Sequence, residues 1–126
     1  MSKQFSSRAE LRQKLITGVS TLADHVASTL GPRGRNVILQ EKGKMPIITK
    51  DGVTVAKFVD LEDPIENAGA QLVKQASAKT NFDAGDGTTT STVLTKAIFD
   101  EATECFDKDI NPVELKKGVE RAVREV

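Results

Sequence analysis

The first part of the chain carries apolar residues at a helical period. Ser7 and Glu10 have the spacing of a capping box, which satisfies unpaired amides at a helix start. Apolar side chains then recur in steps of three and four, at Leu11, Leu15, Val19, Leu22, Val26 and Leu30. The pattern ends at Gly31-Pro32, because proline cannot continue a helix and disfavours helical geometry in the residue before it. We therefore predict an amphipathic helix of about six turns before Gly31.

Two short runs rich in β-prone residues follow this helix. They cover residues 36–39 and 46–49, and the polar residues 40–44 separate them. This arrangement predicts a β-hairpin. Because two strands alone are marginally stable in water, we expect the hairpin to pack on helices or to pair with a strand of a neighbouring subunit.

The remaining apolar periodicity predicts further helices. Asp63-Pro64 should cap a second helix that runs to about Lys79, and Asn111-Pro112 should open the last one. Between them, after a polar break over residues 81–87, a third helix is expected from Thr88 to about Cys105. The expected inward residues are, in order along the three helices, Ile65, Ala68, Leu72, Val73 and Ala76; Val93, Leu94, Ala97 and Ile98; and Leu115, Val119, Ala122 and Val126. The last pattern is unfinished at Val126, so we expect a longer protein.

Composition supports a mainly α fold with one small β-hairpin. The 126 residues include no tryptophan or tyrosine, and Ala, Val, Leu, Lys and Glu are frequent, which favours helices. A chain of this length forms one domain or part of one. Cys105 is the single cysteine, so neither a disulfide framework nor a thiolate metal cluster can form within the chain. With neither an apolar signal segment nor a stretch of about 20 apolar residues, a soluble, cytoplasmic protein is expected.

Charge is balanced overall but polarised along the chain. From Met1 to Lys50 there are nine basic and three acidic residues, so this part carries about +6 and the remainder about −6. Such polarity suits an assembly interface or an anionic ligand. Nucleic-acid binding is not expected, because no basic run is interleaved with aromatic side chains that could stack on bases.

The segment Gly85–Thr90 combines glycines, an acid and three threonines just before a predicted helix. Unpaired amides and the positive end of the helix dipole attract anions at such a position, and glycines allow close approach of a phosphate. Asp86 supplies a hard oxygen ligand suited to Mg²⁺. A helix cap with a glycine turn remains the alternative at this stage.

Two further turns carry similar potential. Lys50 and Asp51 place a cation and a carboxylate side by side at the hairpin exit, as phosphoryl transfer requires, although an exposed ion pair would look the same. Residues 29–34 end a helix with two glycines and Arg33, where simple C-capping is the alternative. Together the three turns suggest a nucleotide cleft built from loops. Neither a P-loop nor a Rossmann fingerprint occurs, and His25 and Cys105 are expected to be surface or packing residues.

Read in order, these turns resemble the signature of group I, bacterial-type chaperonins. The matching stretches are 29–37 (TLGPRGRNV), 48–56 (ITKDGVTVA) and 84–90 (AGDGTTT), with further agreement at 61–63, 66–67 and 69–71. The resemblance covers nearly the whole chain from about Arg8 onward. It implies that residues 1–126 are the amino-terminal half of an equatorial, ATP-binding domain, whose intermediate and apical domains are not in this sequence.

The resemblance also implies roles for individual residues. Thr29, Leu30, Gly31 and Pro32 would line the nucleotide site, and Lys50 would reach the phosphates. Asp86, as the metal ligand, would hold phosphate and Mg²⁺ together with Gly87, Thr88, Thr89 and Thr90. Asp51 matches the family's carboxylate near the γ-phosphate, whereas a second catalytic carboxylate lies beyond Val126. The implied cofactors are ATP and Mg²⁺, with K⁺ as a further candidate.

The same resemblance implies an ATPase that assists protein folding in the complete, assembled subunit. The partners would be identical subunits in a seven-membered ring, single or double, with unfolded proteins and a co-chaperonin lid bound by the other domains. Arg33 stands where lysine is common, and residues 107–110 replace a smaller glycine-containing turn, which puts ring-to-ring contacts in doubt. The rival interpretations are an oligomerisation module without catalysis, or a truncated fragment without ATPase activity of its own. An unrelated phosphotransferase would need an acceptor pocket that the sequence does not show.

Overall fold

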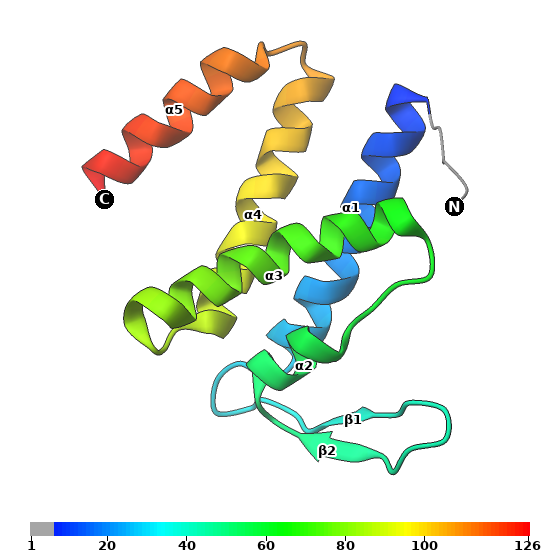
Figure 1. The fold of residues 1–126 in the computed structure, drawn as a ribbon. Coiled ribbons are helices and arrows are strands. Elements are labelled where there is room, and N and C mark those ends of the chain that lie inside the picture. Colours follow the sequence, from blue (N-terminus) through cyan, green and yellow to red (C-terminus); the bar gives the residue numbers. More distant parts are fainter. Residues whose placement is uncertain (1–6) are drawn as a thin grey trace. The chain divides into compact units, whose positions relative to one another are not determined.

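A computed structural model describes residues 7–126, which are mainly helical with one antiparallel hairpin (Figure 1). This confirms the predicted fold class. In chain order the elements are α1 (Arg8–Ala27), β1 (Val37–Leu39), β2 (Ile47–Thr49), α2 (Gly52–Phe58), α3 (Pro64–Ala84), α4 (Thr88–Asp107) and α5 (Pro112–Glu125). The chain forms two compact units, one up to Lys96 and one from Ala97 to Val126.

Side chains cap three helices at their predicted starts. The Ser7 hydroxyl accepts a hydrogen bond from the amide of Glu10 at 3.2 Å. The Asp63 carboxylate accepts from two amides of α3, and the Asn111 side chain accepts from the amide of α5 residue Val113 at 2.8 Å. These polar residues satisfy amides that would otherwise lack partners, and so they set where the helices begin.

The core of the first unit lies where α1 crosses α3 (Figure 1). Its fully buried apolar side chains are Val19, Leu22, Val26, Val55 and Val73. Two glycines set the crossing: a Cβ on Gly18 would collide with the backbone of Glu66, and one on Gly69 would lie 2.6 Å from the carbonyl oxygen of Leu15. The two helix backbones therefore approach one another closely.

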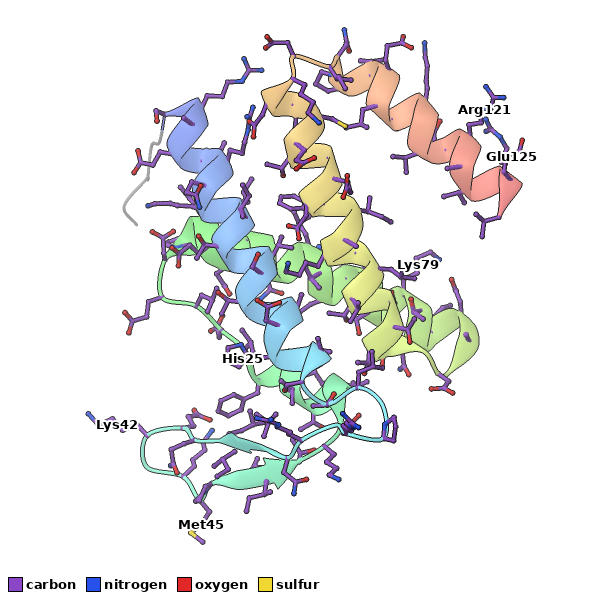
Figure 2. All side chains as sticks on the ribbon, turned by 180° about the vertical axis from the view of Figure 1, so that it is seen from behind. His25, Lys42, Met45, Lys79, Arg121 and Glu125 are labelled. Carbon is purple, nitrogen blue, oxygen red and sulfur yellow. The ribbon has the colours of Figure 1, made fainter. Side chains whose placement is uncertain are left out.

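The hairpin pairs Val37 with Thr49, Ile38 with Ile48, and Leu39 with Ile47. Leu39 is buried and β1 contacts α2, so the expected packing of the hairpin on a helix is confirmed. Ile38 and Ile48 remain 68% and 66% exposed. Figure 2 shows Lys42 and Met45 projecting from the connecting turn.

Two predicted helix ends were wrong, and one helix was not predicted. α1 ends at Ala27 instead of Leu30, because Thr29 and Leu30 donate their amides to carbonyls only three residues back, which tightens and ends the helix. α3 continues through the expected polar break to Ala84, where Gly85 adopts the left-handed conformation that ends it. The helix α2 was missed, since residues 50–54 were interpreted as a turn.

Several predicted inward residues face solvent. Leu72, Leu94 and Ile98 are more than half exposed, and Ala68 and Ala97 are exposed as well. The buried residues of α3 are instead Gly69, Ala70, Val73 and Ser77, and those of α4 are Thr88 and Thr92. Gly69 is buried because the close crossing of α3 with α1 leaves no room for a side chain at this position.

The second unit comprises the end of α4 and α5. Asp109 has a φ of 59°, and the amides of Asp109 and Ile110 donate to the carbonyls of Phe106 and Cys105. This is the hydrogen-bond pattern of a Schellman motif, with aspartate where glycine is usual. α4 and α5 also line an apolar hollow of about 310 Å³ that includes Leu115 and Val119. Of the residues predicted to face inward on α5, Val119, Ala122 and Val126 are exposed.

Candidate functional site

Three turns that are distant in sequence meet at one cleft of about 290 Å³ in the first unit. Its lining residues are Thr29, Leu30, Gly31, Lys50, Asp51, Gly52, Asp86, Gly87, Thr88, Thr89 and Thr90. The structure thus brings together every residue that the sequence singled out for the site except Pro32, which lies in the first turn but does not line the cleft. Gly52 also lines the cleft, although it was not among the predicted site residues.

The first turn is held by its own backbone. The Thr29 hydroxyl donates to the carbonyl of Val26 at 2.7 Å, and the amide of Gly34 donates to the carbonyl of Gly31 at 2.9 Å. Gly31 has a φ of 77°, a conformation that glycine adopts without steric cost. The turn therefore presents Thr29, Leu30 and Gly31 to the cleft on a defined backbone.

Gly52 lies where the start of α2 meets the other two turns. A Cβ at this position would collide with the hydroxyl of Thr89 and come within 3.2 Å of both the Thr29 hydroxyl and the Val26 side chain. Any larger residue here would force the Thr89 side chain to move. The residue is therefore a packing requirement of the cleft, and its role was not recognised in the sequence.

Asp51 is the N-cap of α2. Its carboxylate accepts hydrogen bonds from the amides of Val53 (3.3 Å) and Thr54 (3.2 Å) and from the Thr54 hydroxyl (2.6 Å). The Thr54 hydroxyl bond is the main cause that lowers the pKa of Asp51, against partial burial; the two amides and the charge of Lys57 lower it further. Asp51 is thus ionised at neutral pH and fixed in orientation.

The third turn leaves backbone amides available at the start of α4. Gly85 and Gly87 have φ values of 71° and 81°, and the Asp86 carboxylate accepts from the amide of Gly87 at 2.7 Å. The first backbone bond of α4 runs from the amide of Ser91 to the carbonyl of Gly87. Within the described residues, no hydrogen bond engages the amides of Thr88, Thr89 and Thr90. These three amides and the helix dipole can therefore receive an anion at the cleft.

The charged side chains at the cleft are one cation and two anions. Lys50, Asp51 and Asp86 all line it, so the formal sum is −1. No group of three or more His, Cys, Asp or Glu side chains suited to a metal ion occurs in residues 7–126. A divalent ion held here would need further oxygen ligands besides the carboxylates, such as hydroxyls, water or the phosphates of a bound molecule.

The described structure is thus that of a mainly helical protein with a polar cleft assembled from three loops and the start of a long helix. Residues 22–126 match the model of the TCP-1/cpn60 chaperonin family. The match spans most of the chain and includes all three turns, so the protein belongs to this family. None of the described helices is long and apolar enough to cross a membrane.

Sequence reasoning missed α2, although one signal was present. Asp51 precedes a run that ends in Val55, Ala56, Lys57 and Phe58, and aspartate is a preferred N-cap. The helix has only seven residues, which is too short to display the apolar period by which the longer helices were recognised.

Proposed function

We propose that the cleft binds Mg-ATP, and that the chain is the amino-terminal half of the ATPase domain of a group I chaperonin subunit. The observation that carries this proposal is the meeting of Lys50, Asp51 and the Gly85–Thr90 turn around one polar cleft. The family match supports chaperonin function in general. Nucleotide turnover would then drive assisted protein folding.

The size and polarity of the cleft favour the phosphates as the part of the nucleotide held here. A volume of about 290 Å³ is at the lower limit of small-molecule pockets, and the lining has one large apolar side chain, Leu30. The free amides of Thr88, Thr89 and Thr90 suit phosphate oxygens. Contacts to the adenine and ribose would come mainly from sequence beyond Val126.

The charge balance favours a nucleotide that carries a metal ion. A polyphosphate alone would be repelled by Asp51 and Asp86, and Lys50 offsets only one of these charges. Mg²⁺ would supply positive charge to the phosphate oxygens, and Asp86 is the residue proposed to hold it. K⁺ is a further candidate cation.

Asp51 is proposed to orient the attacking water. A carboxylate has about four acceptor positions, and the hydrogen bonds from Val53 and Thr54 occupy three of them, two on Oδ2 and one on Oδ1. One position on Oδ1 remains for a water molecule. Because the carboxylate is ionised and held by α2, it can accept that hydrogen bond without losing entropy in the transition state.

Equilibrium binding of Mg-ATP to the purified protein tests the proposal. Asp86→Ala should abolish the dependence of affinity on Mg²⁺, and Lys50→Ala should weaken binding about tenfold or more, since a charge-assisted hydrogen bond is lost. Asp83→Ala and Lys44→Ala are matched controls, because these residues form ion pairs outside the cleft. Unchanged affinity in both cleft variants would contradict the proposal.

An oligomerisation module without catalysis is the second candidate. The exposed Ile38 and Ile48 of the hairpin favour a contact surface. A seven-membered ring, with unfolded proteins and a co-chaperonin bound by other domains in the cytoplasm, would combine both functions. Failure to bind Mg-ATP, together with self-association lost in Ile38→Lys, would leave the module as the better description.

A further inference from the structure

A second pocket lies between α2 and α3 and shares no residue with the cleft. Its volume is about 180 Å³, and its lining residues are Val53, Ala56, Lys57, Lys74, Ser77, Ala78 and Asn81. All of them belong to the first unit. Nothing in the proposed binding of ATP requires this pocket.

The Ser77 side chain is buried at the wall of this pocket. The residue is 6% exposed and lines the pocket, yet no hydrogen bond to its side chain occurs in the described part of the chain. The hydroxyls of Thr80 on α3 and Thr92 on α4, by contrast, donate to backbone carbonyls or to another hydroxyl. A buried hydroxyl that lacks a partner is unfavourable, so the Ser77 hydroxyl is available to a polar group that enters the pocket.

The two charged side chains that line this pocket are both lysines. Lys57 and Lys74 line the pocket, and no acidic residue does. Neither lysine forms an ion pair among residues 7–126, whereas Lys79, one turn further along α3, pairs with Asp83 at 2.8 Å. Figure 2 shows Lys79 on α3. The pocket therefore favours an anion.

The walls decide which anion fits. Val53, Ala56 and Ala78 are apolar, and the volume is about six times the roughly 30 Å³ that a water molecule occupies in the liquid. A phosphate, with many acceptor sites, would find apolar walls on several sides. A carboxylate needs about four donors, which the Ser77 hydroxyl, the Asn81 amide and the two ammonium groups can supply.

We infer that this pocket is a binding site for a carboxylate on a short aliphatic stem, such as a small organic acid or a glutamate side chain. The methylene groups would lie against the three apolar residues. The carboxylate would reach Ser77 and the two lysines.

Titration of the ¹⁵N-labelled protein with sodium propionate, at ionic strength held constant with sodium chloride, tests the inference. Saturable shifts should appear at the amides of Lys74, Ser77 and Asn81. Ser77→Ala and Lys74→Gln should each weaken binding about tenfold, because each removes a donor to a charged group. The matched control Lys79→Gln should leave the affinity unchanged.

Two probes distinguish the sources of the carboxylate. If glutamate blocked at its amino and α-carboxyl groups binds at least as well as propionate, an acidic side chain of a protein segment is the natural occupant. If propionate binds and blocked glutamate does not, the occupant is a free acid. Equal shifts with chloride alone, tighter binding of inorganic phosphate, or unchanged affinity in Lys74→Gln would each overturn the inference. Asp86→Ala should leave this binding intact, so failure of the ATP proposal would not affect it.

Discussion

The helical glycines provide a sharp test of the fold, because the same substitution should have opposite effects at two of them. Gly18 in α1 faces the backbone of Glu66 in α3, so that an added Cβ would collide with a carbonyl group that cannot move aside as a side chain can. Gly118 in α5 has nothing within 4 Å of an added Cβ. Helix propensity favours alanine at both positions by about 0.5–1 kcal/mol.

At Gly18 the collision should exceed this gain. Overpacking costs about 1–3 kcal/mol, and contact with backbone belongs at the upper end, so Gly18→Ala should lower the free energy of unfolding by about 2 kcal/mol. Amides of α1 and α3 would then exchange with solvent about thirtyfold faster. In Gly118→Ala, amides of α5 should exchange about two- to fivefold more slowly.

Hydrogen exchange followed by NMR measures both effects in the same way. Gly69→Ala, with its nearest atom at 2.6 Å, should shift exchange in the same direction as Gly18→Ala but by less. If Gly18→Ala slowed exchange as Gly118→Ala does, α1 and α3 would not cross at close range and the reasoning would be refuted.

Three other predictions concern single side chains. Asp109→Gly should stabilise the end of α4 by about 1 kcal/mol, because glycine adopts the φ of 59° without strain, and Asp109→Ala should not; urea unfolding of the two variants checks this. The Lys14 ammonium lies 2.7 Å from the Asp63 carboxylate and is the main cause that lowers the pKa of Asp63 from 3.8 to about 2. The stability that this pair contributes is therefore present above pH 3.8 and is lost as the pH falls toward 2. Lys14→Met should therefore move acid unfolding, followed by circular dichroism, to higher pH, and an unchanged midpoint would contradict the assignment. Asp51→Asn keeps the cap of α2 but removes the charge, so it should slow single-turnover ATP hydrolysis about tenfold or more with little change in affinity; if only Asp51→Ala were impaired, Asp51 would be a cap and no more.

Local rules predicted the elements whose signals are carried by neighbouring residues. Ser7, Asp63 and Asn111 cap helices as expected, and the hairpin lies where two β-prone runs flank a polar turn. The three turns of the candidate cleft were also recognised. Their meeting at one place could not follow from periodicity, because it depends on how α1 and α3 cross.

Burial was harder to predict, for a physical reason. A helical period indicates which residues share a face but not how near the facing backbone lies. On α3 that distance selects Gly69 for the interior, whereas Leu72 is left about half exposed. Hydrophobicity alone would have predicted that Leu72 is buried and Gly69 exposed.

The connection between the hairpin and the cleft is very short. β2 ends at Thr49 and α2 begins at Gly52, so Lys50 and Asp51 are the whole connection. Two residues span at most about 7 Å when fully extended. A partner strand that displaced β2 would therefore also displace the ammonium of Lys50. It would strain the hydrogen bonds that orient the Asp51 carboxylate. A displacement of the hairpin would therefore change the distance between the Lys50 ammonium and the carboxylates of the cleft.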